Sequence, residues 1–268
     1  MNAPVNPNYS AVRPLPMPLR LGMLLRLFAV QGSWNYETLL GNGIAFAMEP
    51  ALRGLPGGRG GDAYRAAMAR ESRYFNAHPY LASFAVGALA RAELDGVPPA
   101  QIDRFRAAMC GPLGSIGDRL IWAGWLPCVA MLSLLAFGAG ANGVMVAVLF
   151  LVTYNAGHIV LRAWGLNAGW RQGLQVAAAL GRPILRDLPQ RLAGATVVIA
   201  GAALPLAVRR LIGDSGATVP GAAGTLAATA LVIAAVLGLA LVRLHGRVEG
   251  WKVAFGVLLL VVIYSGLR

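Results

Sequence analysis

The side chains best suited to accept a phosphoryl group or to act as a general base are three histidines, His78, His158 and His245. They are scattered along the chain, and each has a simpler interpretation as a polar residue of a turn, a helix face or a loop. The sequence also contains no glycine-rich loop ending in GKS or GKT, no HExxH motif and no GxSxG motif. We therefore predict that the chain is not an enzyme and has no catalytic residue.

The sequence also argues against a metal site. Cys110 and Cys128 are the only cysteines, and they form no CxxC pair. They lack the further ligands that a zinc site needs, so we expect no metal ion and no cofactor. Both cysteines are interpreted as small apolar packing residues.

A short polar series lies late in a long apolar run. Asn155, His158 and Arg162 are spaced i, i+3 and i+7, which places them on one face of a helix. Polar groups at membrane depth face the protein interior rather than lipid. The series therefore forms either structural hydrogen bonds between subunits or part of a ligand path.

A glycine-rich segment precedes the first long apolar run. Residues 111–118 read GPLGSIGD, and the sequence predicts a break in the helix there. Irregular backbone near hydrocarbon survives only where it is buried in protein or lines a polar cavity. Such a break would offer backbone amides and carbonyls to a hydroxyl-rich ligand. The alternative is an ordinary turn between two helices.

The elements that must position these residues are mostly apolar. Five apolar runs follow residue 119, at residues 120–137, 144–161, 193–208, 226–242 and 253–264. A transmembrane helix needs about 20 apolar residues, so the longer runs qualify, and the third and fifth require protein neighbours. The segment GAGANG at residues 138–143 fits GxGxxG by letter, but it joins two apolar runs and is interpreted as a tight turn.

The first part of the chain contains shorter apolar segments. Residues 20–30, 38–52 and 79–90 cannot cross a bilayer, which suits interfacial or re-entrant helices. We therefore predict an all-α integral membrane protein with about five transmembrane helices in its C-terminal half. Its parts are a mobile tail at residues 1–19, an interfacial and re-entrant arm region at 20–118, and a transmembrane region at 119–268.

Composition and charge agree with a lipid environment. Hydrophobic residues make up 57% of the chain and charged residues 13%, against roughly 25% charged in soluble domains. The net charge is +12, and Lys252 is the only lysine. Because the arginines flank apolar runs instead of forming one basic stripe, they indicate the positive-inside bias of membrane loops and not a nucleic-acid partner. We expect the loops at residues 162–191 and 243–252 to face the cytoplasm.

Several ordered blocks resemble one known family. Residues 30–37 (VQGSWNYE) and 47–53 (AMEPALR) look like the opening signature of the IID component of mannose/fructose/sorbose phosphotransferase systems. Residues 74–82 (YFNAHPYLA) resemble the FFNTxPY block of that family, and residues 110–118 (CGPLGSIGD) resemble its MGPLAGIGD block. The segment from Tyr154 to Gly173 resembles the last signature block of that family, which contains an asparagine, an RYYG motif and a GYxxG motif in this order.

The resemblance implies a membrane subunit that pairs with a IIC subunit and assembles as a trimer of such pairs. The pair carries a hexose inward, and a cytoplasmic IIB protein, charged through IIA, phosphorylates it. The IID component itself holds no phosphohistidine. The expected location is the bacterial cytoplasmic (inner) membrane, with several passes through the lipid bilayer.

The resemblance and the polar pattern together suggest which residues line the substrate path or the subunit interface. These are Gln31, Asn35, Asn76, His78, Gly111, Gly114, Gly117, Asp118, Asn155 and His158. Arg119 and His158 depart from residues that are usual in the family. Two alternatives therefore remain, a divergent IID-like scaffold or regulatory subunit without transport, and a stand-alone secondary transporter. The latter would require an internal repeat and paired intramembrane acids, and the sequence offers neither.

Overall fold

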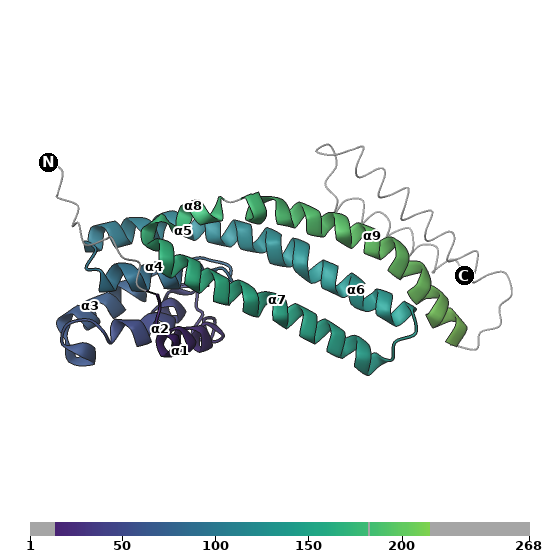
Figure 1. Cartoon of the computed structure of the whole chain (residues 1–268), viewed down its shortest axis with the longest axis horizontal. Coiled ribbons are helices and arrows are strands. Elements are labelled where there is room, and N and C mark those ends of the chain that lie inside the picture. The colour runs from purple at the N-terminus through teal and green to yellow at the C-terminus, as the bar shows by residue number, and fades with distance from the viewer. Residues whose placement is uncertain (1–13, 182, 215–268) are drawn as a thin grey trace.

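The structure is a computed structural model that describes residues 14–181 and 183–214. The described chain is built from helices. Figure 1 shows that α1 to α4 gather at one end, and that long helical rods formed by α5 with α6, by α7 and by α9 extend from this end side by side. The short helices therefore form the base from which the rods project.

The base is organised around α4 (Ala82–Leu94), which is buried along almost its whole length. A helix that is apolar on all sides belongs in a protein core, and α4 packs against α2 and α7. Around it lie α1 (Met17–Leu27), α2 (Gly41–Leu52) and α3 (Asp62–Glu71). The short segments that the sequence suggested for the arm region thus form a helical core of their own.

The first rod is continuous. It runs through α5 (Pro99–Gly117), the π-helix η3 (Asp118–Trp125) and α6 (Leu126–Gly138) without interruption. The sequence-based prediction of a break at residues 111–118 is therefore wrong. Glycine costs about 1 kcal/mol in a helix interior, whereas each unpaired backbone group near hydrocarbon costs several, so the helix continues.

The second and third rods complete the described part. A tight turn leads from α6 to α7 (Gly143–Gln172), as predicted, and Asn142 caps α7 by accepting a hydrogen bond from the Met145 amide at 2.9 Å. The short helices η4 (Gly173–Val176) and α8 (Ala177–Leu180) lead into the third rod, α9 (Pro183–Asp214). Arg162, which stood both on the predicted helix face and at the start of the predicted loop at residues 162–191, lies inside α7 and is buried.

Within residues 14–181 and 183–214, three helical stretches are long and apolar enough to cross a membrane: Pro99–Gly138, Gly143–Val176 and Leu185–Leu211. They contain the first three of the five predicted spans. The predicted spans at residues 226–242 and 253–264 lie outside the described residues.

Small residues allow the second rod to lie directly on the core helix. A Cβ atom added at Gly87 would come within 2.3 Å of the Leu166 carbonyl oxygen, and one at Gly169 within 2.2 Å of the Phe84 carbonyl oxygen. Both obstacles are backbone atoms, which cannot move aside as a flexible side chain can. This contact fixes α7, with its polar series, against the base.

Candidate functional site

A group of aromatic and polar side chains lies where α1, the turn before α4, η3 and α7 meet. We call it the aromatic–histidine cluster. Its members are Phe28, His78, Tyr80, Trp122, Tyr154, Asn155, His158 and Arg162.

Arg162 is the charged centre of the cluster. Its side chain comes from α7, and the residue is only 4% exposed. The guanidinium carbon lies 5.1 Å from the centre of the Phe28 ring and 4.7 Å from that of Tyr80. Nη1 donates a hydrogen bond to the Leu27 carbonyl at the end of α1, a favourable position for a cation. No described carboxylate forms an ion pair with Arg162, and its buried Nε atom has no described hydrogen-bond partner.

The face of α7 before Arg162 presents a polar ladder. His158 Nε2 lies 2.8 Å from Asn155 Oδ1, and the Asn155 amide group donates to the Leu151 carbonyl. His158 therefore carries its proton on Nε2, since the amide oxygen can only accept. Its buried Nδ1 is left as an acceptor without a described partner.

Tyr80 joins this ladder to the base. Its ring stacks on His158 with the ring centres 4.7 Å apart. The hydroxyl oxygens of Tyr80 and Tyr154 are 3.0 Å apart, so one donates to the other. Two hydroxyl groups, one ring face and one histidine thus share a small volume.

His78 forms the other side of the cluster. Its Nδ1 accepts a hydrogen bond from the Tyr80 amide at 3.2 Å, which leaves the proton on Nε2, and Nε2 is buried without a described acceptor. The ring packs against Gly117, where an added Cβ would come within 2.1 Å of the His78 Cβ. Burial lowers the pKa of His78 to about 4, although the negative charge of Asp118 acts in the opposite direction. His78 is therefore neutral near pH 7 and offers a hydrogen-bond donor.

Three buried nitrogen atoms of the cluster, His78 Nε2, His158 Nδ1 and Arg162 Nε, thus have no described hydrogen-bond partner. Buried polar groups are normally paired, so unpaired ones indicate a water molecule or a ligand. Together with the aromatic faces they suit a ligand that has hydroxyl groups and an apolar ring surface. No group of three metal-ligating side chains occurs in the part of the chain that the structure describes.

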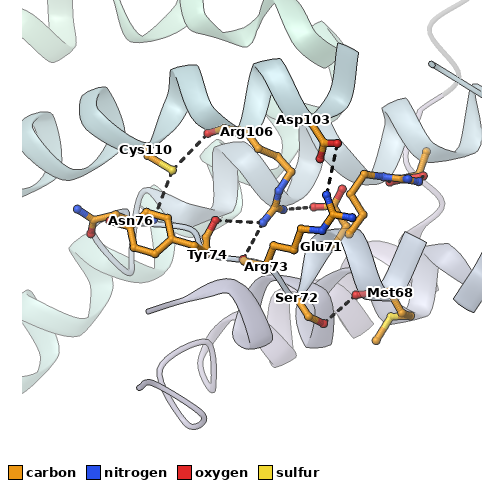
Figure 2. A network of polar contacts seen from close by, with 11 residues as sticks. Met68, Glu71, Ser72, Arg73, Tyr74, Asn76, Asp103, Arg106 and Cys110 are labelled. Carbon is orange, nitrogen blue, oxygen red and sulfur yellow. Dashed lines mark hydrogen bonds and ion pairs between the residues drawn. The ribbon is translucent and has the colours of Figure 1, made fainter. Parts of the chain in front are cut away.

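A second polar network lies in the base and is built differently. Arg106 of α5 forms an ion pair with the buried Glu71 and donates to the carbonyl of Arg73 at 2.9 Å, as Figure 2 shows. It also donates to the Tyr74 carbonyl, so the pair holds the chain that leads to Asn76. We call the buried ion pairs of the base the arginine–carboxylate network. Besides Glu71, two buried carboxylates among the described residues are bonded to arginine.

The first of these is Glu49 on α2. It accepts hydrogen bonds from Arg26, Arg53 and Arg59 at 2.7 to 2.9 Å. The pKa of Glu49 is lowered to about 2, and the hydrogen bond from Arg53 is the largest of the causes. Glu93 on α4 accepts two bonds from Arg70, each 2.8 Å long.

The structure brings some of the predicted site residues together. His78, Gly117, Asn155 and His158 take part in the cluster or its packing, and Asp118 is close enough to influence His78 through its charge. The predicted common face of Asn155, His158 and Arg162 is confirmed by the contacts of these residues around Tyr80 and Phe28.

The other predicted residues lie elsewhere. Asn35 organises its own loop, because its side chain bonds to Ser33 and Thr38 and accepts from the Glu37 amide. Gln31, Asn76 and Gly111 are exposed, and a Cβ atom added at Gly111 or Gly114 would meet nothing within 4 Å. The Asn76 amide faces the Cys110 sulfur at 3.5 Å.

Sequence reasoning missed the aromatic members of the cluster. Tyr154 precedes His158 by one helical turn, so the i, i+4 spacing could have identified it. Tyr80 follows His78 by two residues in the same signature block. Phe28 and Trp122 carry no such signal, because only the fold brings Phe28 to His158 and Trp122 to His78.

Comparisons with known proteins agree with this architecture. The family model described as "PTS system mannose/fructose/sorbose family IID component" matches residues 19–209. The mannose-specific EIID component of Escherichia coli K12 is 27% identical over 211 residues, which cover 73% of this chain and 72% of that protein. The sorbose-specific EIID component of Klebsiella pneumoniae is 27% identical over 212 residues, covering 74% and 76%. For the fructose permease IID component of Bacillus subtilis the identity is 26% over 210 residues, covering 72% and 74%.

Two solved structures share the fold. A chain in the complex of the mannose transporter ManYZ with microcin E492 superposes with a TM-score of 0.55 at 21% identity, covering 94% of this chain and 97% of that one. A second structure, described as a membrane protein, gives a TM-score of 0.65 at 21% identity, covering 95% and 98%. The predicted class, an all-α membrane protein, is confirmed.

Proposed function

This chain belongs to the mannose/fructose/sorbose family of phosphotransferase IID components, and we propose that it pairs with a IIC subunit to move a hexose across the bacterial cytoplasmic membrane. The chain is a membrane subunit of a phosphotransferase permease. In the proposed complex, three IIC–IID pairs assemble as a trimer. A IIB protein that receives its phosphoryl group from IIA phosphorylates the arriving sugar, and this chain supplies no catalytic group.

A hexose is the substrate class that the relatives and the cluster both support. The relatives named above are specific for mannose, sorbose or fructose, all of which are hexoses. A hexose combines several hydroxyl groups with an apolar ring face. The aromatic–histidine cluster presents unpaired donors and acceptors beside aromatic faces, and this is the observation that carries the proposal.

The predicted site residues divide into two groups under this proposal. His78, Asp118, Asn155 and His158 belong to the sugar path, and Gly117 allows His78 to reach it. The exposed or conformationally structural residues belong to the surface that meets IIC. These are Gln31, Asn35, Asn76, Gly111 and Gly114.

The test measures phosphoenolpyruvate-dependent sugar uptake and co-purification with IIC in the same variants. Tyr154→Phe removes one hydroxyl group from the cluster, and we expect it to weaken apparent sugar affinity roughly 2- to 10-fold. Asp118→Asn removes a charged acceptor and should weaken affinity roughly 10- to 150-fold. Both variants should still co-purify with IIC.

Tyr36→Phe is the matched control, because the Tyr36 side chain is 88% exposed and lies outside the cluster. It should transport normally. Normal uptake by both Tyr154→Phe and Asp118→Asn would contradict the ligand role of the cluster. Assembly with IIC but no uptake in the wild-type chain would instead favour a scaffold role.

A further inference from the structure

A cavity of about 320 Å³ lies between η3, α7 and α9, and none of the members of the aromatic–histidine cluster lines it. The lining residues are Leu120, Ile121, Trp125, Gly157, Val160, Leu161, Trp164, Leu185, Leu188 and Leu192.

The cavity is apolar throughout. It contains no charged side chain, and the indole N–H of Trp125 already donates to the Tyr154 carbonyl at 3.4 Å. A water molecule needs two to four polar partners, so a cavity of this kind does not hold ordered water. A hydrocarbon group is the occupant that its chemistry favours.

The cavity is partly open to the surface on the side of α7. Its lining residue Val160 is 67% exposed, and Ile159 beside it is 42% exposed. Both belong to Gly143–Val176, which is long and apolar enough to span a membrane. An exposed apolar face on such a helix suits lipid acyl chains at the cavity mouth.

Two arginines lie on the turns of α9 that line the cavity. Arg186 and Arg191 are exposed and alternate with the lining residues Leu185, Leu188 and Leu192. Arg186 contacts Asp187 at 3.2 Å, whereas no described residue bonds to the side chain of Arg191. These turns lie at the start of the span Leu185–Leu211, the depth at which lipid head groups are expected.

We propose that the cavity binds one acyl chain of a membrane glycerophospholipid whose anionic head group lies against Arg191 and Arg186. A helix of a partner subunit is the alternative occupant, and the arginines beside the cavity favour the anionic lipid. An acyl chain is slender enough to enter, and a basic cluster beside it suits an anionic phosphate.

The experiment uses the purified IIC–IID complex after its lipid has been exchanged for detergent. Phosphatidylglycerol brominated in its acyl chains is added, and tryptophan fluorescence is followed, because bromine quenches a nearby indole and Trp125 and Trp164 line the cavity. We expect saturable quenching. Arg191→Gln should raise the half-saturating lipid concentration roughly 10-fold or more, since it removes a charge-assisted contact.

Leu188→Trp fills the cavity and should reduce the amount of phosphatidylglycerol retained by the purified complex at least several-fold. Val152→Trp, on the exposed side of α7, is its matched control and should leave retention unchanged. Both variants are compared only after they co-purify with IIC. Arg209→Gln, at the far end of α9, is the control for Arg191→Gln.

Three results would overturn the proposal. The first is quenching that rises linearly with lipid and does not saturate. The second is equal half-saturation by brominated phosphatidylcholine, which has no net charge. The third is efficient cross-linking of IIC to Leu188→Cys, because a protein segment would then occupy the cavity.

Discussion

The two polar regions of this molecule treat buried charge in opposite ways. In the arginine–carboxylate network of the base, Glu49, Glu71 and Glu93 each form ion pairs with at least one arginine. In the aromatic–histidine cluster, Arg162 has aromatic rings and one carbonyl oxygen around it but no described carboxylate in an ion pair.

This difference concerns charge. Each buried carboxylate of the base is matched by an arginine, although Glu71 Oε1 has no described hydrogen-bond partner, and breaking such a pair leaves an uncompensated charge in a medium of low polarity. Arg162 has no described counter-charge, and the unpaired nitrogen atoms of the cluster retain hydrogen-bonding capacity. Ion pairs thus hold α1 to α5 together, whereas the ligand role that we propose for the cluster depends on its unpaired groups.

The largest expected effect comes from breaking the ion-paired region. Burial raises the pKa of Glu71, and the positive charge of Arg106 acts in the opposite direction and favours the ionised carboxylate of the ion pair. Glu71→Gln therefore leaves Arg106 buried without its counter-charge, and an arginine cannot release its proton to escape the penalty. We expect the free energy of unfolding in detergent to fall by about 3–5 kcal/mol. The measurement is thermal or denaturant unfolding followed by tryptophan fluorescence.

Glu37→Gln is the matched control, because Glu37 is exposed, and it should change stability by less than about 0.5 kcal/mol. The double variant Glu71→Leu with Arg106→Met should recover much of the loss, because it removes both charges. If Glu71→Gln unfolds like the wild type, the ion pair is not a structural centre.

A second, intermediate effect concerns pH. The folded pKa of His78 is about 4, below its ordinary value of 6.5, because burial opposes its charge. The unfolded chain therefore binds more protons between pH 4 and 6.5, and stability rises with pH in that window. The contribution is complete above pH 6.5 and is lost on acidification, and we expect a fall of about 1–2 kcal/mol after allowance for solvent screening.

His78→Gln should flatten the pH profile between pH 6.5 and 4. The depressed pKa of Glu49, about 2, acts only as the pH falls from 4.5 toward 2, so the two windows are separable. An unchanged profile in His78→Gln would show that another group causes the loss.

The smallest expected effect on stability is that of a change at Arg162, and it tests the contrast between the cluster and the base most directly. Arg162→Met replaces an unpaired buried charge by an apolar chain of similar length. The variant no longer holds a charge away from water. This gain in folding free energy offsets the loss of the hydrogen bond to Leu27 and of the contacts with Phe28 and Tyr80. We expect stability within about 1 kcal/mol of the wild type, but apparent sugar affinity roughly 10-fold weaker.

Arg209→Met, which changes an exposed arginine near the end of α9, should alter neither quantity. A loss of stability as large as that of Glu71→Gln would mean that both regions are structural. The comparison between them would then fail.

Much of the architecture followed from residue types alone. The apolar runs predicted the membrane-spanning parts of the three described rods, and the GAGANG segment at residues 138–143 predicted the turn between two of them. The i, i+3 and i+7 spacing correctly placed Asn155, His158 and Arg162 on one face. These inferences succeed because helix periodicity and hydrophobicity act locally along the chain.

The errors arose where local preference and environment disagree. Residues 111–118 contain three glycines and a proline, yet they form helix, because an unpaired backbone near hydrocarbon costs more than poor helix propensity. Arg162 stood both on the predicted helix face and at the start of the predicted loop at residues 162–191. The structure keeps it in α7, where its bond to the end of α1 and its aromatic neighbours make burial tolerable.

The sequence by itself determined that the chain is an all-helical membrane protein, where its described spans lie and which polar residues share a face. Only the tertiary structure decided that Phe28, Tyr80 and Trp122 join those residues, and that the buried carboxylates of the base have arginine partners while Arg162 has no described carboxylate partner. The physical reason is distance along the chain. Pairing between residues tens of positions apart depends on how helices pack, and packing here depends on close backbone contacts such as that between α4 and α7.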